Sequence, residues 1–242
     1  KSQVEAMRGL AFYTAGIVDL SRHADDEETR QVAKQRAALL TPVLKAWATE
    51  TAQEITTLGV QVHGGMGFVE ETGAAQHMRD ARILTIYEGT TGIQAGDFAG
   101  RKVLADEGKA IAEVISEMRS LDEELAADER LAEIRAALSE GVEQLETATA
   151  WLLQQGSSDP NAAGSASVNL LMLTGTVLGG WQMARAALKI VNGTAAVDSD
   201  FAEAKIATTR FYAQHILPRS RALHAAATAG SDALMMLAED AF

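Results

Sequence analysis

The carboxylate of Glu88 stands in a sequence setting that could support acid–base chemistry. It lies in the segment TIYEGTT, after the apolar Ile86 and Tyr87 and before the flexible Gly89. Partial burial would make this carboxylate a stronger base, whereas the N-terminus of a following helix would weaken it. Taken alone, the segment favours an ordinary glutamate in the first turn of a helix over a base.

A group of glycines precedes this segment. Gly64, Gly65 and Gly67 would let the backbone approach a ligand closely, and the amides of Gln61 and Gln94 would offer neutral hydrogen bonds near it. A tight turn between two helices explains the same glycines equally well. The pattern therefore points to a ligand loop without establishing one.

Charged residues lie between these two groups, in the motif RDAR. Arg79, Asp80 and Arg82 place opposite charges within about one turn of a helix. This arrangement predicts an internal network of ion pairs rather than a catalytic group.

Metal and covalent chemistry have little support in the sequence. The chain has no cysteine and no serine in a nucleophile-elbow pattern, so we expect no covalent catalysis. The histidines lack the i, i+4 pairing of a helical metal site, so we expect no metal. These histidines are His23, His63, His77, His215 and His224.

The composition limits the classes of partner. The chain has 242 residues, 47% of them hydrophobic, and a formal net charge of -12. Such a charge disfavours nucleic acid and anionic lipid surfaces. We expect no membrane span, because no uninterrupted apolar run approaches the length of about 20 residues that a bilayer requires. The absence of cysteine suits a reducing compartment, and we expect a cytoplasmic protein.

Apolar residues recur at helical spacing over most of the chain, and alanine, leucine and glutamate are frequent. The expected fold class is all-α. Pro42 predicts a kink or a break of its helix near Thr41. Acidic amphipathic helices begin after Ala105, which predicts a boundary between domains 1–104 and 105–242. Long helices are expected over 1–24, 28–59, 168–191 and 198–228, and amphipathic surface helices within 106–138. A linker is expected at 155–165, and close helix packing at Gly175, Gly179 and Gly180.

The motifs QVHGGMGF, MRDARIL and IYEGTTGIQ resemble, in order and spacing, the C-terminal helical domain of the acyl-CoA dehydrogenase family. This resemblance covers roughly residues 1–104. The acidic helices that follow resemble the extra domain of a longer bacterial subgroup, which includes enzymes similar to methylthiopropionyl-CoA dehydrogenase. The implied fold is an up-and-down helical bundle followed by a second small helical bundle.

The resemblance implies a reaction and a role for the YEGT motif. Glu88 would be the catalytic base that removes the α-proton of an acyl-CoA thioester, while FAD accepts a hydride from the β-carbon. The backbone N–H of Glu88 and a flavin ribityl hydroxyl would polarise the thioester oxygen. Tyr87 and Gly89 would line the substrate site.

The resemblance also implies two sets of flavin contacts. Thr90 and Gln94 would contact FAD near the YEGT motif, whereas Gln61, Gly64 and Gly65 would reach the FAD of a neighbouring subunit. A homodimer or a dimer of dimers is therefore expected.

One position departs from the family pattern. Many relatives carry a larger polar residue where this chain has Gly92, which leaves one flavin contact open.

The family's N-terminal helical domain and middle β-domain would precede Lys1, so we expect the chain to be a fragment. On its own it would bind FAD weakly or not at all and would not turn over. In the full-length parent, an electron-transfer flavoprotein would take the electrons in fatty acid metabolism. Two alternatives remain: an acyl-CoA oxidase, and a non-catalytic relative kept for assembly or binding.

Overall fold

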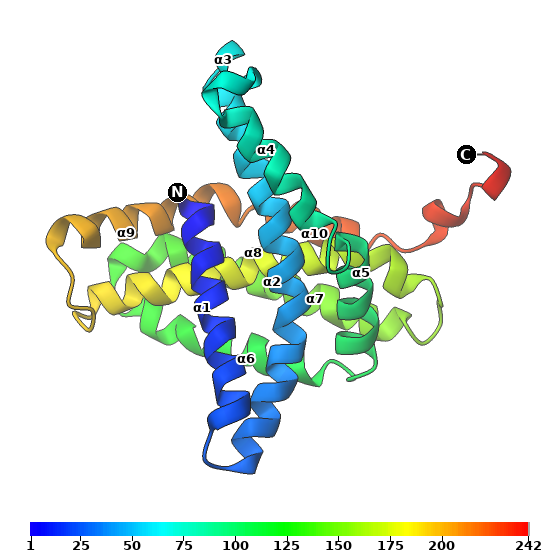
Figure 1. The fold of residues 1–242 in the computed structure, drawn as a ribbon. Helices are drawn as coiled ribbons and strands as arrows, with labels where there is room; N and C mark the ends of the chain where they lie inside the picture. The colour runs from blue at the N-terminus through cyan, green and yellow to red at the C-terminus, as the bar shows by residue number, and fades with distance from the viewer. Residues whose placement is uncertain (242) are drawn as a thin grey trace.

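The computed structural model describes residues 1–241, which form helices joined by turns, with no strand in that range. Figure 1 shows their arrangement. The all-α fold class is confirmed. The helices are α1 (Ser2–His23), α2 (Glu27–Val62), α3 (Gly65–Phe68), α4 (Ala74–Arg82), α5 (Thr91–Gly96), α6 (Lys109–Ala126), α7 (Ala132–Gln155), α8 (Ala162–Val191), α9 (Ser199–Phe211) and α10 (Arg219–Ala227), with π-helical segments at Asp97–Leu104 and Tyr212–Ile216.

Helix α8 lies at the centre, and α1 and α2 cross it (Figure 1). Two of its glycines face the indole of Trp47. A Cβ built at Gly175 would lie 2.2 Å from Trp47 Cγ, and one at Gly179 would lie 2.8 Å from Trp47 Cη2. The predicted role of these glycines in close helix packing is therefore confirmed, since any side chain would displace Trp47.

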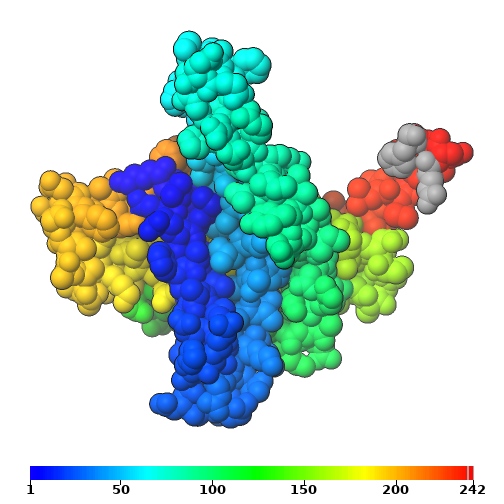
Figure 2. Space-filling model, viewed as in Figure 1, coloured from blue at the N-terminus to red at the C-terminus, as the bar shows by residue number. Residues whose placement is uncertain are grey.

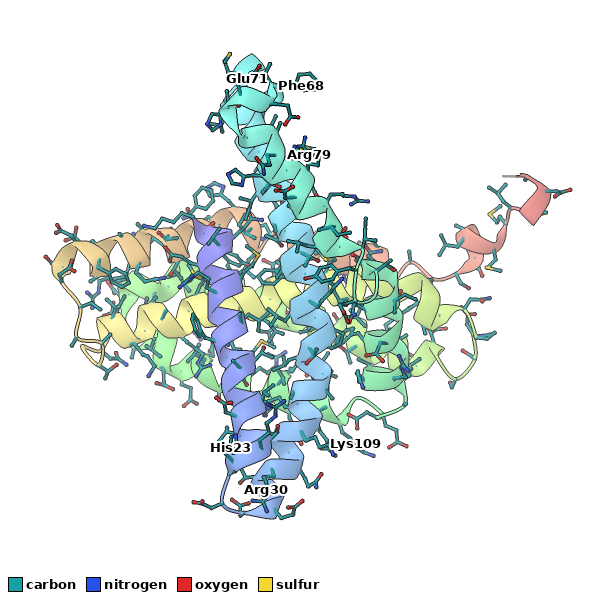
Figure 3. The ribbon with its side chains drawn as sticks, in the orientation of Figure 1. His23, Arg30, Phe68, Glu71, Arg79 and Lys109 are labelled. Carbon is teal, nitrogen blue, oxygen red and sulfur yellow. The ribbon has the colours of Figure 1, made fainter. Side chains whose placement is uncertain are left out.

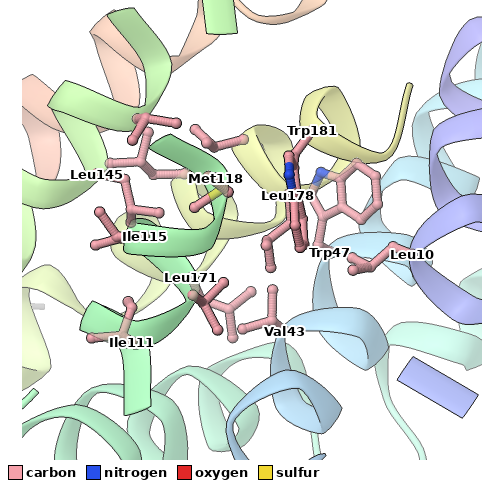
Figure 4. Packing of buried hydrophobic residues seen from close by; sticks show 14 of the residues in the cluster. Leu10, Val43, Trp47, Ile111, Ile115, Met118, Leu145, Leu171, Leu178 and Trp181 are labelled. Atoms are coloured by element: carbon pink, nitrogen blue, oxygen red, sulfur yellow. The ribbon is translucent and has the colours of Figure 1, made fainter. Parts of the chain in front are cut away.

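A single hydrophobic core joins the two predicted domains. Figure 4 shows Trp47 near Trp181, with apolar side chains of α6, α7 and α8 around them. The core is continuous across Ala105, and the division into domains 1–104 and 105–242 stays a prediction. The labelled core residues from both ranges are Leu10, Val43, Trp47, Ile111, Ile115, Met118, Leu145, Leu171, Leu178 and Trp181.

Helix α2 continues without a break from Glu27 to Val62. Its N-cap residue is Asp26, whose side chain accepts a hydrogen bond from Thr29 N at 2.7 Å. The predicted break near Thr41 is absent, because the helix continues through Pro42. The alternative, a kink at this point, stays a prediction. A proline inside a helix costs about 3 kcal/mol, whereas burying each neighbouring aliphatic side chain contributes about 1.5–3 kcal/mol. Leu39, Leu40 and Val43 are all buried, and this burial offsets the lost backbone bond.

The end of α2, together with α3 and α4, projects from the body as an arm (Figures 1 and 2). We define the arm as residues 53–82. Gln53 Nε2 donates to Met78 O at 3.5 Å, which joins the two sides of the arm near its base. Val62 and Phe68 are 84% and 82% exposed near its tip.

Helix α8 is long and apolar enough to cross a bilayer by length and composition alone. Within the fold, however, 67% of its most apolar window is buried. Burial against other helices is the environment of a central core helix, and it explains the apolar sequence without a membrane.

Candidate functional site

The turn that carries Glu88 has an unusual backbone. It lies between the 3-10 segment Ile83–Thr85 and α5. Glu88 has φ 55°, and Glu107 is the other non-glycine residue of positive φ among residues 1–241. A left-handed conformation costs a residue with a Cβ about 1–2 kcal/mol, so other contacts must hold this turn.

Two side chains hold the carbonyl groups of this turn. Gln94 Nε2 donates to Glu88 O at 3.0 Å, and Lys45 Nζ donates to Gly89 O at 2.6 Å. Gly89 has φ 91°, and a Cβ at this position would lie 2.8 Å from Gln94 Nε2. Glycine is therefore required beside Glu88. The carboxylate of Glu88 itself belongs to an exposed residue.

The threonines after Gly89 anchor the start of α5. Thr90 Oγ1 accepts from Ile93 N at 3.4 Å, as expected of an N-cap residue. Thr91 Oγ1 donates to Glu50 Oε1 at 2.5 Å, which gives α2 a second contact with this segment. A Cβ at Gly92 would find Thr90 Oγ1 at 4.0 Å as its nearest neighbour, so the fold leaves room for a larger residue there.

Large apolar residues in the segments beside the turn are exposed. Tyr87 is 51% exposed, and Lys45 Nζ lies 5.9 Å from the centroid of its ring. Exposed apolar residues that gather in one place mark surfaces that bind a ligand or another part of a protein. The large apolar residues exposed near Glu88 are Ile83 (54%), Ile86 (46%), Tyr87 (51%) and Ile93 (63%).

The second set of candidate residues lies at the tip of the arm. Gln61, Gly64 and Gly65 are exposed there, and no heavy atom lies within 4 Å of a Cβ built at either glycine. Lys45, which contacts the Glu88 turn, precedes Gln61 by 16 residues of continuous helix, or about 24 Å. One copy of the chain therefore brings Glu88, Tyr87, Gly89, Thr90 and Gln94 together but leaves the tip residues apart from them.

The charged motif of α4 pairs differently from the prediction. Arg79 forms a two-point ion pair with Glu70, at 2.7 and 3.1 Å, and the arginine holds the pKa of the Glu70 carboxyl below its usual value. Figure 3 shows Arg79 on the arm. The prediction of ion pairs within RDAR was wrong, because adjacent residues on a helix point in different directions. Arg82 instead donates to Thr85 Oγ1 at 3.4 Å.

An apolar groove of about 710 Å³ lies along the same arm. Phe68, Val69 and Met78 contribute to its apolar lining, and Arg82 also lines it. Glu88 does not line it. No group of three or more His, Cys, Asp or Glu side chains within the described residues has the arrangement of a metal site.

Two family models together match residues 3–238. The model described as "Acyl-CoA dehydrogenase, C-terminal domain" matches residues 3–103. The model described as "Acetyl-CoA dehydrogenase C-terminal like" matches residues 104–238. The chain belongs to the acyl-CoA dehydrogenase family.

Individual acyl-CoA dehydrogenases match most of the chain. The chain is 43% identical to 3-methylmercaptopropionyl-CoA dehydrogenase of Ruegeria pomeroyi, over 97% of this chain and 40% of that protein. It is 32% identical to broad-specificity linear acyl-CoA dehydrogenase FadE5 of Mycobacterium tuberculosis, over 90% of this chain and 38% of that protein. The chain thus spans about two fifths of the length of these relatives.

A solved structure has the same fold. The acyl-CoA dehydrogenase of Bacillus anthracis, in complex with FAD, matches 92% of this chain and 40% of its own, with a TM-score of 0.73 and 19% identity. This match supports the helical architecture of the acyl-CoA dehydrogenase C-terminal region.

Sequence reasoning on this acyl-CoA dehydrogenase chain missed the residues that support the turn from α2. Lys45 and Glu50 lie within a long helix, and their partners Gly89 and Thr91 are more than 40 positions away in the sequence. A lone lysine in the otherwise apolar stretch 42–48 was the available signal, since a cation that becomes buried needs a partner.

Proposed function

We propose that this chain belongs to a flavin-dependent enzyme that dehydrogenates an acyl-CoA thioester between its α- and β-carbons, with Glu88 as the base. The observation that carries the proposal is the conformation of Glu88. A non-glycine residue at φ 55° is held in an exposed turn by donors from Gln94 and Lys45. Strained residues that the surrounding structure holds in place are concentrated at functional sites.

The chemistry requires a positioned base and a polarised carbonyl. The α-proton of a thioester is weakly acidic, and a carboxylate removes it efficiently only when the thioester oxygen accepts hydrogen bonds at the same time. The Glu88 carboxylate would take this proton, and the Glu88 N–H would donate to the thioester oxygen. Tyr87 and Gly89 would line the acyl-thioester site. FAD, when bound, accepts the hydride that leaves the β-carbon.

The flavin candidates have the chemical character that FAD needs. Thr90 and Gln94 carry polar groups beside Glu88, and the backbone at Gly64 and Gly65 is uncovered. Uncovered glycine backbone and a neighbouring amide, here Gln61, suit the polar edges of a nucleotide cofactor.

The separation of these two sets supports an oligomer. Gln61 lies about 24 Å along α2 from Lys45, which contacts the Glu88 turn, so one copy holds the two sets far apart. We propose that the arm of one subunit contributes Gln61, Gly64 and Gly65 to the flavin site of another. A homodimer, or a dimer of dimers, satisfies this arrangement.

The isolated chain would hold FAD weakly. Gln61, Gly64, Gly65 and Thr90 are exposed and Gln94 is only half-buried, so neither set encloses a flavin. Measuring flavin absorbance after purification of the 242-residue chain tests this expectation. Tight binding at one FAD per chain would contradict it.

The electron acceptor proposed for the full-length enzyme is an electron-transfer flavoprotein. The relatives named above are dehydrogenases, which supports this acceptor over oxygen. Release of one peroxide per product in the full-length, FAD-loaded protein would instead identify an acyl-CoA oxidase. A cytoplasmic location stays a prediction.

The direct test replaces Glu88 by Gln in the full-length, FAD-loaded protein. Removal of a general base is expected to lower turnover by about 10²–10⁴-fold while FAD content stays unchanged. Glu107→Gln is the matched control, because Glu107 has the same φ of 55° but pairs with Lys109 outside this site. Equal turnover of E88Q and E107Q would overturn the assignment, and would favour a non-catalytic relative.

A further inference from the structure

Lys45, a residue of α2, contacts the turn that carries Glu88. Its side chain is half-buried, and its ammonium donates to Gly89 O at 2.6 Å while lying 5.9 Å from the centroid of the Tyr87 ring. A hydrogen bond from a charged donor is about twice as strong as a neutral one. One cation of α2 thus contacts the residues on both sides of Glu88.

The turn needs such support because glycine follows the base. Glycine has access to a wide range of backbone angles, so Gly89 would let the Glu88 peptide rotate. Two bonds remove this freedom. Gln94 Nε2 fixes the peptide that begins with the Glu88 carbonyl, and Lys45 Nζ fixes the peptide that begins with the Gly89 carbonyl. Because each peptide unit is planar, Gly89 lies between two fixed planes.

Helix α2 gives Lys45 a rigid base. In α2, Lys45 lies between the fully buried Val43 and Ala46, and Trp47 packs against α8. Five residues further along, Glu50 accepts from Thr91 Oγ1 at 2.5 Å. The turn is therefore attached to the core through two polar side chains of one helix, and of these only Lys45 contacts the peptide next to Glu88.

We infer that Lys45 is a positioning residue for Glu88: its ammonium fixes the Gly89 peptide and thereby holds the carboxylate of the base at the substrate α-carbon. The inference rests on the proposed role of Glu88. Lys45 itself need not touch the substrate or the flavin. Its effect on the reaction would pass through the orientation of the base.

The test uses Lys45→Met in the full-length, FAD-loaded protein, because methionine keeps an apolar stem and removes the ammonium. A misplacement of about 1 Å can reduce a rate by about 10²-fold, so kcat should fall about 10- to 100-fold while KM changes about twofold or less. Proton removal should also become slower relative to other steps, which raises the kinetic isotope effect with α-deuterated acyl-CoA. Lys45→Arg, which keeps a charged donor, should restore most of kcat.

Two further variants separate positioning from general stability. Lys34→Met removes an exposed lysine from the same helix and should leave kcat and the isotope effect unchanged. In the Glu88→Gln background, K45M should change the residual rate by about twofold or less, because a residue that acts through the base has no effect once the base is gone. If K45M fails to load FAD, Lys45→Gln replaces it, since the shorter amide cannot reach the Gly89 carbonyl as lysine does.

The outcomes are distinct. Wild-type kcat and isotope effect in K45M would overturn the inference, and so would an equal loss in K45M with and without Glu88. If E88Q keeps wild-type turnover, the proposed role of Glu88 is refuted, and the inference about Lys45 is refuted with it. A loss in E88Q without a loss in K45M would refute only the role of Lys45.

Discussion

Arg36 on α2 donates to Glu117 Oε2 on α6 at 2.6 Å, and so joins the ranges that two different family models match. The same guanidinium donates to Tyr13 Oη at 3.2 Å. The guanidinium of Arg185 lies 5.3 Å from the centroid of the Tyr13 ring and 4.9 Å from that of Trp181. Charged and aromatic side chains therefore link α1, α2, α6 and α8 at the edge of the shared core.

Replacing Arg36 by Met should lower the free energy of unfolding by about 1–2 kcal/mol, because it removes charge-assisted bonds in a partly buried site. A double-mutant cycle with Glu117→Gln should give a coupling energy of about 0.5–1.5 kcal/mol. Urea unfolding of the chain measures both. Arg130→Met, which breaks a local surface pair with Asp128 two residues away, should hardly change the urea midpoint. Additive effects of R36M and E117Q would contradict the proposed link.

Gly175→Ala should destabilise the chain strongly, because the new Cβ would lie 2.2 Å from Trp47 Cγ. Overpacking of a filled core typically costs about 1–3 kcal/mol. Gly164→Ala is the matched control in the same helix, since it has no heavy atom within 4 Å of its built Cβ. It should be neutral or stabilise by up to about 1 kcal/mol. Thermal unfolding of the two variants checks the contrast, and equal stability would contradict the packing.

The helical class and the packing role of the α8 glycines both follow from patterns within a few residues. Local propensity and periodicity decide such features. The sequence could not name Trp47 as the partner of Gly175, because that contact depends on how two distant helices cross. It also led to a wrong partner for Arg79, whose true partner Glu70 becomes adjacent only after the tip of the arm folds back.

The candidate site was predictable in composition but not in geometry. The motif around Glu88 points, by resemblance, to this residue as the proposed base, whereas its positive φ and the bond from Lys45 arise from tertiary packing. Pro42 shows that tertiary packing can also override a local sequence signal. Its local preference for ending a helix is overcome by the burial of its neighbours Leu40 and Val43, which the sequence alone does not quantify.

Gly89→Ala should impair the reaction more than the fold. The alanine would have to adopt φ 91° with its Cβ 2.8 Å from Gln94 Nε2, so the turn would rearrange and move Glu88. In the full-length, FAD-loaded protein, turnover should fall at least about 10-fold. The free energy of unfolding should fall by only about 1–2 kcal/mol, the cost of placing a Cβ at a positive φ. Gly96→Ala, with no heavy atom within 4 Å of its built Cβ, should keep normal turnover. Normal turnover in G89A would show that the turn tolerates another conformation.

A polar contact between α2 and α10 should make stability depend on pH. Glu54 Oε2 accepts from Arg219 Nη1 at 2.8 Å and from Gln3 Nε2 at 3.1 Å. The hydrogen bond from Arg219 lowers the pKa of Glu54 below its ordinary value of 4.5, against the opposing effect of burial. Because this pKa is lower in the folded state, the stabilisation is fully present above about pH 4.5 and is lost as the pH falls through the folded-state value.

Arg219→Met should therefore destabilise the chain more at pH 7 than at pH 3. The Arg219 and Glu54 side chains are 47% and 36% exposed, so solvent screening limits the cost at pH 7 to about 0.5 kcal/mol. Near pH 3 the cost should shrink, because Glu54 is then increasingly protonated in both wild type and variant. Urea unfolding of both proteins at the two pH values measures this difference, and Glu54→Gln should remove it. A cost of R219M that grows as the pH falls would show that Arg219 stabilises the fold by another contact.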